Sequence, residues 1–122
     1  MRVIEELLAN NRSYADSLPE QHFDVRPTLR LAIVTCMDSR LDVFQALGLK
    51  PGEAHVLRNA GGVITDDVIR SLAVSQRRLG TERIMLIHHT DCGLQQLSDD
   101  GFRAELQKAT GVAPAFAIES FS

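Results

Sequence analysis

LAIVTCMDSR, residues 31–40, is the stretch that decides the fold of this 122-residue chain. Residues 31–35 form an apolar run rich in β-branched side chains, which is typical of a strand buried in a sheet. A thiol (Cys36), a carboxylate (Asp38) and a guanidinium (Arg40) follow directly. Because ligand sites in open α/β sheets form beyond the C-terminal ends of strands, these three side chains mark a candidate site.

A second apolar run, residues 83–88, also ends in metal-ligand chemistry, because His89 and Cys92 follow it. Zinc binds thiolates and imidazoles in a tetrahedral shell, and catalytic zinc sites use three protein ligands and leave one position open. Cys36, His89 and Cys92 supply such a set, and the short spacing from His89 to Cys92 lets one tight loop present two of them. We predict that the two strand ends meet and hold one zinc, against the competing interpretation of two inert core cysteines.

Helical and extended patterns alternate along the chain. This order predicts an α/β fold, a mainly parallel β-sheet flanked by helices, in a single domain over residues 1–122 with an N-terminal helical arm over about 1–18. The first helix is expected to be short or broken at Asn10-Asn11. The other expected helices are 41–47, 67–79 and 99–109, the strands are 31–35, 54–57 and 83–88, and 58–62 is expected to be a glycine-containing loop.

Composition narrows the classes of function. Hydrophobic residues make up 44% and charged residues 24% of the chain, which is ordinary for a globular protein. A net charge of −3 without a Lys/Arg cluster argues weakly against nucleic acid as a partner. The apolar runs are far shorter than the ~20 residues that cross a membrane. The absence of a signal-peptide pattern and the count of two cysteines, too few for a disulfide framework, favour the cytoplasm.

Asp38 and Arg40 are informative because of their neighbours. Two thiolates cancel the charge of Zn²⁺, so a bound water would be less acidic than at a three-histidine site, where its pKa falls to ~7. A nearby carboxylate could accept the hydrogen of zinc-bound hydroxide and orient its lone pair, and Arg40 could hold Asp38 ionised through a bidentate pair. Taken alone, an Asp/Arg pair is more often a surface ion pair of little consequence.

Other site types fit the residues less well. A Cys-x5-Arg phosphatase loop is excluded because Asp42 stands at the arginine position, and residues 58–62 lack the G-x-G-x-x-G fingerprint of a dinucleotide site. A nucleophilic cysteine activated by His89 remains open. His88 points to the opposite face of its strand from His89 and is expected to be a packed residue or to support the site, not to bind metal. His22 and His55 are expected to be unrelated to the metal.

Three blocks of sequence together resemble the β-class carbonic anhydrases, most closely the small prokaryotic and archaeal members. The blocks are CMDSR (residues 36–40), RNAGG (58–62) and HTDCG (89–93), in the family's order and spacing. The resemblance implies one Zn²⁺ per chain, held by Cys36, His89 and Cys92, with Asp38 and Arg40 as the catalytic dyad. It implies reversible hydration of carbon dioxide to bicarbonate and a proton by zinc-bound hydroxide, and a homodimer or higher homo-oligomer.

Two alternatives accompany this resemblance. Close relatives with this zinc site hydrolyse carbon disulfide or carbonyl sulfide, and a zinc-binding domain with impaired catalysis is also possible. Members of the family usually continue beyond this point with another helix and strand, whereas this sequence ends at Ser122. We therefore expect the last predicted strand to have an unpaired, hydrophobic edge, and the 122-residue chain to be less stable than longer relatives or to depend on association.

Overall fold

The computed structural model describes residues 2–20 and 23–120, and the predicted alternation of elements is confirmed there. Bounds shift by one or two residues, and residues 58–59, predicted as loop, extend a strand. His22 lies outside the described residues. The elements are α1 (Arg2–Ser17), β1 (Leu31–Cys36), α2 (Val43–Leu47), β2 (Ala54–Asn59), the 3₁₀ turn η1 (Ala60–Gly62), α3 (Asp66–Leu79), β3 (Arg83–Ile87), the 3₁₀ turn η2 (Gly93–Gln96) and α4 (Asp99–Thr110).

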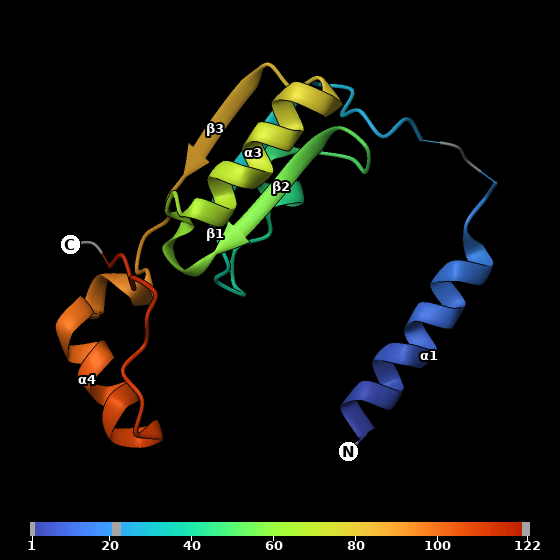
Figure 1. Ribbon diagram of the computed structural model, residues 1–122. Coiled ribbons are helices and arrows are strands. Elements are labelled where there is room, and N and C mark those ends of the chain that lie inside the picture. Colours follow the sequence, from blue (N-terminus) through green and yellow to red (C-terminus); the bar gives the residue numbers. More distant parts are fainter. Residues whose placement is uncertain (1, 21–22, 121–122) are drawn as a thin grey trace.

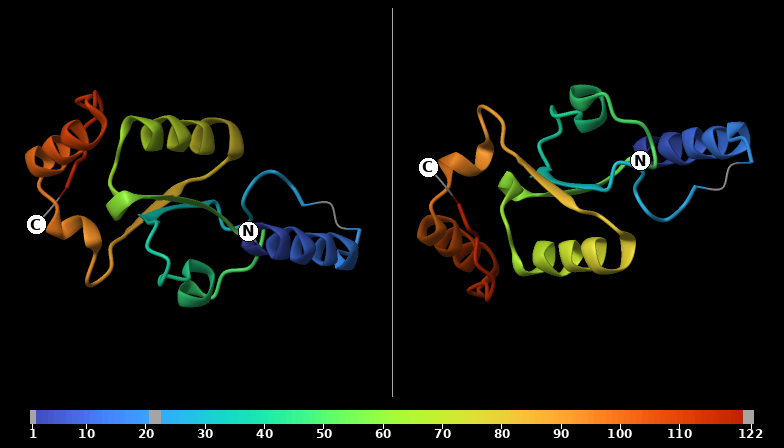
Figure 2. Two further views of the ribbon diagram at one scale, coloured as in Figure 1. Left: turned by 90° about the horizontal axis from the view of Figure 1, so that it is seen from below. Right: turned by 90° about the horizontal axis from the view of Figure 1, so that it is seen from above.

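The three strands form one parallel sheet in the order β2-β1-β3 (Figure 1). Ile33 of β1 pairs with Val56 of β2 and with Met85 of β3. Views along the sheet show α3 on one face and α2 on the other (Figure 2). This arrangement brings the C-terminal ends of β1 and β3 to the same edge of the sheet, which confirms the predicted fold class.

The core is centred on β1. The side chains of Ala32, Ile33, Val34 and Thr35 are fully buried, because a central parallel strand is covered on both faces. Thr35 satisfies its hydroxyl by donating to the carbonyl of Ile87, at 3.0 Å. The apolar run that decides the fold is therefore also shielded from solvent in the folded protein.

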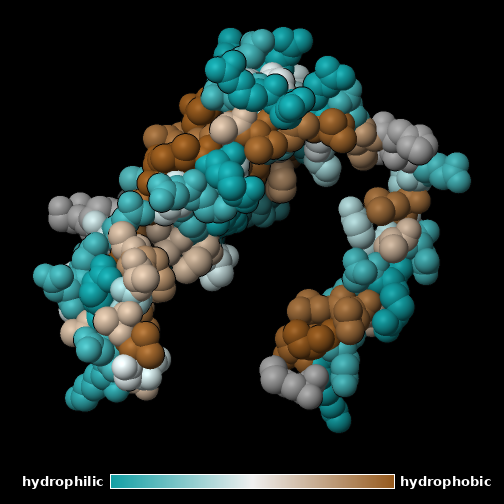
Figure 3. Space-filling view, in the orientation of Figure 1, coloured by the Kyte–Doolittle hydropathy of each residue, from teal (hydrophilic) through white to brown (hydrophobic). Residues whose placement is uncertain are grey.

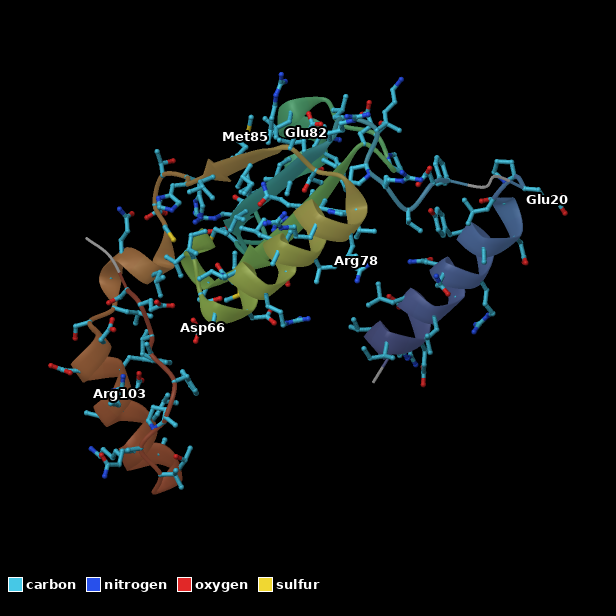
Figure 4. All side chains as sticks on the ribbon, turned by 45° about the horizontal axis from the view of Figure 1, so that its top comes forward. Glu20, Asp66, Arg78, Glu82, Met85 and Arg103 are labelled. Atoms are coloured by element: carbon cyan, nitrogen blue, oxygen red, sulfur yellow. The ribbon has the colours of Figure 1, made fainter. Side chains whose placement is uncertain are left out.

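Local sequence explains where the helices begin and end. Thr65 caps α3 by accepting from the amide of Val68, and Gly80 ends it in the left-handed conformation. Asp66 in its first turn and Arg78 in its last turn complement the helix dipole (Figure 4). The expected break in α1 is wrong. Its 16 residues are continuous across Asn10-Asn11, since the weak helix propensity of two asparagines is offset by the Leu, Ala, Glu and Arg around them.

Apolar side chains remain exposed on α1 and on β3. The helix α1 lies away from the sheet and buries none of its residues (Figure 1). In Figure 3 brown apolar surface follows α1 and the region of β3, the strand at one edge of the sheet. The expected unpaired edge is therefore present in the described part of the chain. None of the described helices is long and apolar enough to cross a membrane.

Candidate metal centre at the strand ends

Arg58 of β2 holds the loop that follows β1. Its Nε donates to the carbonyl of Cys36 at 2.8 Å, and its Nη2 donates to the carbonyls of Asp38 and Leu41 at 2.8 and 2.9 Å. A backbone bond from Met37 N to Asn59 O, at 2.8 Å, adds a fourth tie to β2. Sequence reasoning missed this role, because Arg58 was placed in a loop instead of in the neighbouring strand.

Gly62 lets the η1 turn press against the end of β1. Its φ is +64°, and a Cβ there would lie 2.8 Å from the carbonyl carbon of Thr35 and 2.9 Å from the amide of Cys36. Only glycine adopts this conformation at this distance without strain. The close approach is made to Cys36, the first candidate ligand.

Cys36, His89 and Cys92 come together as predicted. Their ligand atoms all lie within 4.8 Å of one another, and the two cysteines are free thiols with Sγ atoms 3.8 Å apart. Two sulfur ligands at ~2.3 Å from a tetrahedral zinc would themselves be ~3.8 Å apart. Two buried thiols and one half-buried imidazole make up the donor set that zinc prefers, so the residues fit this metal.

The imidazole of His89 is oriented for the same purpose. Its Nδ1 lies 2.8 Å from the carbonyl of Thr90, so Nδ1 carries the ring proton and donates it. Its Nε2 is buried and has no hydrogen-bond partner among the described residues. A buried polar atom without a partner is costly, and a metal would satisfy it.

The ligand groups perturb one another's titration in the metal-free protein. Burial raises the pKa of the Cys36 thiol, but its interactions with the His89 imidazole and with the backbone of Asp38 and Gly61 outweigh burial and lower that pKa to about 7. The contact with Cys36, followed by the bond to the Thr90 carbonyl, raises the pKa of His89. Thiolate character at Cys36 near neutral pH favours metal binding, because the thiolate is the ligand.

Asp38 and Arg40 form a bidentate pair beside these ligands. Arg40 Nε donates to Asp38 Oδ1 at 2.9 Å and Nη2 donates to Oδ2 at 2.6 Å, while the Arg40 amide also donates to Oδ1. These bonds hold the pKa of Asp38 far below its usual range. The Asp38 carboxylate is only 14% exposed, and its Oδ2 lies 3.8 Å from the Nε2 of His89. The pair is therefore part of the candidate site and not a detached surface pair.

Two small cavities flank Asp38. One, of about 220 Å³, is mainly apolar and borders both thiols, and its lining is Cys36, Met37, Asp38, Ala60, Gly61, Cys92, Gly93 and Leu94. The other, of about 240 Å³, is more polar and is lined by Asp38, Arg40, Leu41, His89, Thr90 and Asp91. Asp38 thus lies where an apolar and a charged compartment meet.

His55 and His88 lie outside the cluster. Neither His55 nor His88 joins a group of metal-ligating atoms in the described part of the chain. His55 Nδ1 is 2.7 Å from the hydroxyl of Ser75, which is 2.8 Å from that of Thr81, in a polar network between β2 and α3. The structure also shows a group that sequence reasoning passed over, Asp91, which contacts Arg40. In the sequence, the one indication that Asp91 belongs to the site is its position between two predicted ligands, His89 and Cys92.

Comparisons with known proteins agree on one family. The sequence profile of the carbonic anhydrase family matches residues 31–114. Beta-carbonic anhydrase 1 of Mycobacterium bovis is 53% identical over 121 residues, covering 99% of this chain and 74% of that protein. The crystal structure of carbonic anhydrase from Streptococcus mutans superposes with a TM-score of 0.92 at 45% identity, covering 100% of this chain and 74% of that one.

A carbon disulfide hydrolase is also similar. The enzyme of that name from Saccharolobus solfataricus is 51% identical over 71 residues, which cover 58% of this chain and 35% of that protein. The match to beta-carbonic anhydrase 1 covers 99% of this chain, so it includes both strand ends and the Cys-His-Cys cluster. The chain therefore belongs to the carbonic anhydrase family, in its β class.

Proposed function

We propose that this protein is a zinc enzyme that reversibly hydrates carbon dioxide to bicarbonate and a proton, with Cys36, His89 and Cys92 as the three ligands of one zinc per chain. The observation that carries the proposal is the convergence of these ligand atoms within 4.8 Å, with the Asp38 carboxylate 3.8 Å from His89 Nε2. Membership of the carbonic anhydrase family supports it independently.

When bound, zinc would act as a Lewis acid that lowers the pKa of a water molecule and so makes a hydroxide nucleophile available for carbon dioxide. The thiolates of Cys36 and Cys92 balance the charge of the ion, and the Thr90 carbonyl fixes the His89 ring through Nδ1. Burial of both thiols keeps the donor set away from competing water.

Asp38 is the residue proposed to direct the attack. Its carboxylate would accept a hydrogen bond from the attacking oxygen, which would orient a lone pair of that oxygen toward the substrate carbon. Arg40 keeps Asp38 ionised and fixes its plane through two parallel bonds. The apolar cavity beside the thiols suits a small, uncharged carbon dioxide, and the cavity bordered by Arg40 suits an anionic product.

The decisive experiment is stopped-flow hydration of carbon dioxide by the zinc-loaded protein and by Asp38→Asn. We expect zinc content to be unchanged and kcat/KM to fall by about 100-fold in the variant, because a positioned proton acceptor contributes 10²–10⁴ in rate. Asp67→Asn is the matched control, since Asp67 is also paired with an arginine, Arg70, but lies on α3. One zinc per chain without hydration above buffer from neutral to alkaline pH would identify a zinc-binding domain without catalysis.

Hydrolysis of carbon disulfide is the second candidate reaction. Several similar proteins carry the name carbon disulfide hydrolase, and their similarity to this chain reaches 51% identity over 58% of it. Carbon disulfide is linear and apolar like carbon dioxide, and carbonyl sulfide is intermediate between them, so the same apolar cavity could admit all three. Release of hydrogen sulfide from carbon disulfide at a kcat/KM above that for hydration would make this the main activity.

We further propose that the chain is one domain with α1 as an arm, and that it works as a homodimer or higher homo-oligomer. The support is the exposed apolar stripe of α1, formed by Ile4, Leu7, Leu8 and Tyr14, because contiguous apolar surface of this kind marks interfaces. Sedimentation as a monomer would contradict it. We also propose a reducing, cytoplasmic compartment, because the two free thiols lie 3.8 Å apart and an oxidising compartment would favour a disulfide between them.

A further inference from the structure

The guanidinium of Arg40 is bound on two sides. One side, Nε and Nη2, faces the carboxylate of Asp38 in its own loop. The other side faces Asp91, 51 residues away: Nη1 donates to Asp91 Oδ2 at 3.1 Å, and Nη2 donates to the Asp91 carbonyl at 2.9 Å. Because the planar guanidinium is hydrogen-bonded at both edges, the orientation of the Arg40 side chain depends on both Asp38 and Asp91.

The two sets of bonds do different work. Asp38 and Arg40 are two residues apart in the loop after β1, so their pair fixes only how these side chains lie relative to each other. Asp91 lies in the loop after β3, between His89 and Cys92. The bonds from Arg40 to Asp91 therefore tie the Asp38–Arg40 pair to the loop that carries two of the three candidate ligands.

The backbone of Asp91 adopts an unusual conformation at this contact. Its φ is +56°, a left-handed conformation that most side chains disfavour and that Asp and Asn tolerate. With candidate ligands on both sides, the turn at Asp91 has little freedom to move. Its side chain is 74% exposed and that of Arg40 62%, so the ion pair adds little to stability, and conformational stability does not explain the geometry.

We propose that Asp91 is a positioning residue, whose carboxylate clamps Arg40 so that the Asp38 carboxylate keeps its place beside the ligand atoms. The kinetic part of this proposal rests on the proposed function, whereas the clamp itself does not. Asp91 touches neither substrate nor metal in this scheme, and it acts through Arg40 on Asp38.

The test compares Asp91→Gly, Asp91→Asn and wild type. Glycine removes the carboxylate and keeps the left-handed turn, so it separates the side chain from the backbone. Asparagine keeps one acceptor oxygen and tolerates the same φ, so it should rescue most of the function. Asp67→Ala is the control, because Asp67 is equally exposed at 75% and also paired with an arginine, Arg70.

The first readout is the rate at which the Arg40 Nε–H exchanges with solvent. This rate is measured by ¹⁵N NMR in zinc-loaded and in metal-free protein, and the Nε signal is assigned by its loss in Arg40→Lys. We expect exchange to be about tenfold faster in Asp91→Gly, since the bond to Asp38 then opens more often. Asp91→Asn and Asp67→Ala should stay near wild type. Melting temperatures should not change, which would separate positioning from a structural defect.

The second readout is kcat/KM for carbon dioxide hydration. We expect about a tenfold loss in Asp91→Gly, recovery to within about threefold in Asp91→Asn, and no change in Asp67→Ala. An unchanged kcat/KM in Asp91→Gly would overturn the positioning role, and unchanged Arg40 exchange would overturn the clamp. If wild type itself fails to hydrate carbon dioxide, the proposed function falls, while the exchange experiment still decides whether Asp91 holds Arg40.

Discussion

Strands β1 and β3 have similar apolar sequences and end at the same site, yet their environments differ sharply. Ile33 on β1 is fully buried, whereas Ile84 on β3 is 42% exposed. The difference comes from sheet order: β1 is paired on both sides, while β3 is an edge strand. Apolar content shows that a segment is a strand, and its place in the sheet decides how much of it is buried.

The same contrast extends into the site. The end of β1 is held by four hydrogen bonds to β2, three from Arg58 and one from Met37 to Asn59, and by the close approach of Gly62. The end of β3 continues into an exposed turn at Asp91, tied back through Arg40. One half of the site is built into the sheet, and the other is anchored to it by side chains and, we propose, by the metal.

The largest effect should come from removing a ligand from either half. Cys36→Ser and Cys92→Ser should each weaken zinc binding by more than about 100-fold and abolish hydration. The reason is that losing even an outer-shell partner costs 10–100-fold, and a serine hydroxyl is a poor zinc ligand. Competition with a chromophoric chelator measures this. Wild-type affinity in either variant would remove that cysteine from the ligand set.

The same Ile→Ala substitution on β1 and on β3 should destabilise the central strand more than the edge strand. Ile33→Ala should lower the free energy of unfolding by about 3–4 kcal/mol, because it leaves a cavity in a fully buried layer. Ile84→Ala should cost about 1 kcal/mol, since that side chain is already partly in water. Urea unfolding gives both values. Equal costs would mean that β3 is covered in solution, as an interface between chains would require.

The close approach at Gly62 should cost less than the Ile33 cavity. Gly62→Ala is expected to destabilise by about 3 kcal/mol, through a strained φ and a clash with the backbone of Thr35 and Cys36. Gly48→Ala is the control, because Gly48 has a similar φ of +67° but open space around it. It should cost about 1 kcal/mol. Similar values for the two would show that η1 moves aside easily.

The smallest effect concerns the chain after the β3 half of the site. Hydrogen bonds from the Ser120 side chain and from the amides of Ser120 and Glu119 lower the pKa of Asp99 on α4. Because the pKa of Asp99 is lowered on folding, these contacts stabilise the segment fully at pH values above the ordinary pKa of 3.8. The stabilisation is lost as the pH falls through the lower pKa of the folded state.

Amide exchange of Glu119 and Ser120 should therefore be slow at neutral pH relative to Asp99→Asn, which mimics the protonated acid. The difference between wild type and variant should shrink in strong acid. The amides of β1 should not respond in either case. Equal protection in wild type and variant at neutral pH would show that Asp99 does not hold this segment.

Sequence periodicity was a poor guide to one helix face. The apolar residues of α3 recur with a helical period that includes Ile69, yet Ile69 is exposed and the polar Ser75 is buried. Ser75 is tolerated inside because it bonds to both His55 and Thr81. A polar partner 20 residues away in β2 cannot be deduced from the helix sequence.

The sequence alone determined the elements and the chemistry of this protein. Three features act locally, so their consequences can be read from neighbouring residues. They are the apolar run 31–35, the Thr65 cap of α3, and the order of the cysteine, histidine and acidic residues. Only the tertiary structure decided that β3 is an edge, that Arg58 holds the Cys36 loop, and that Arg40 lies between Asp38 and Asp91. These outcomes depend on contacts between residues that are 17 to 52 positions apart, which no local pattern encodes.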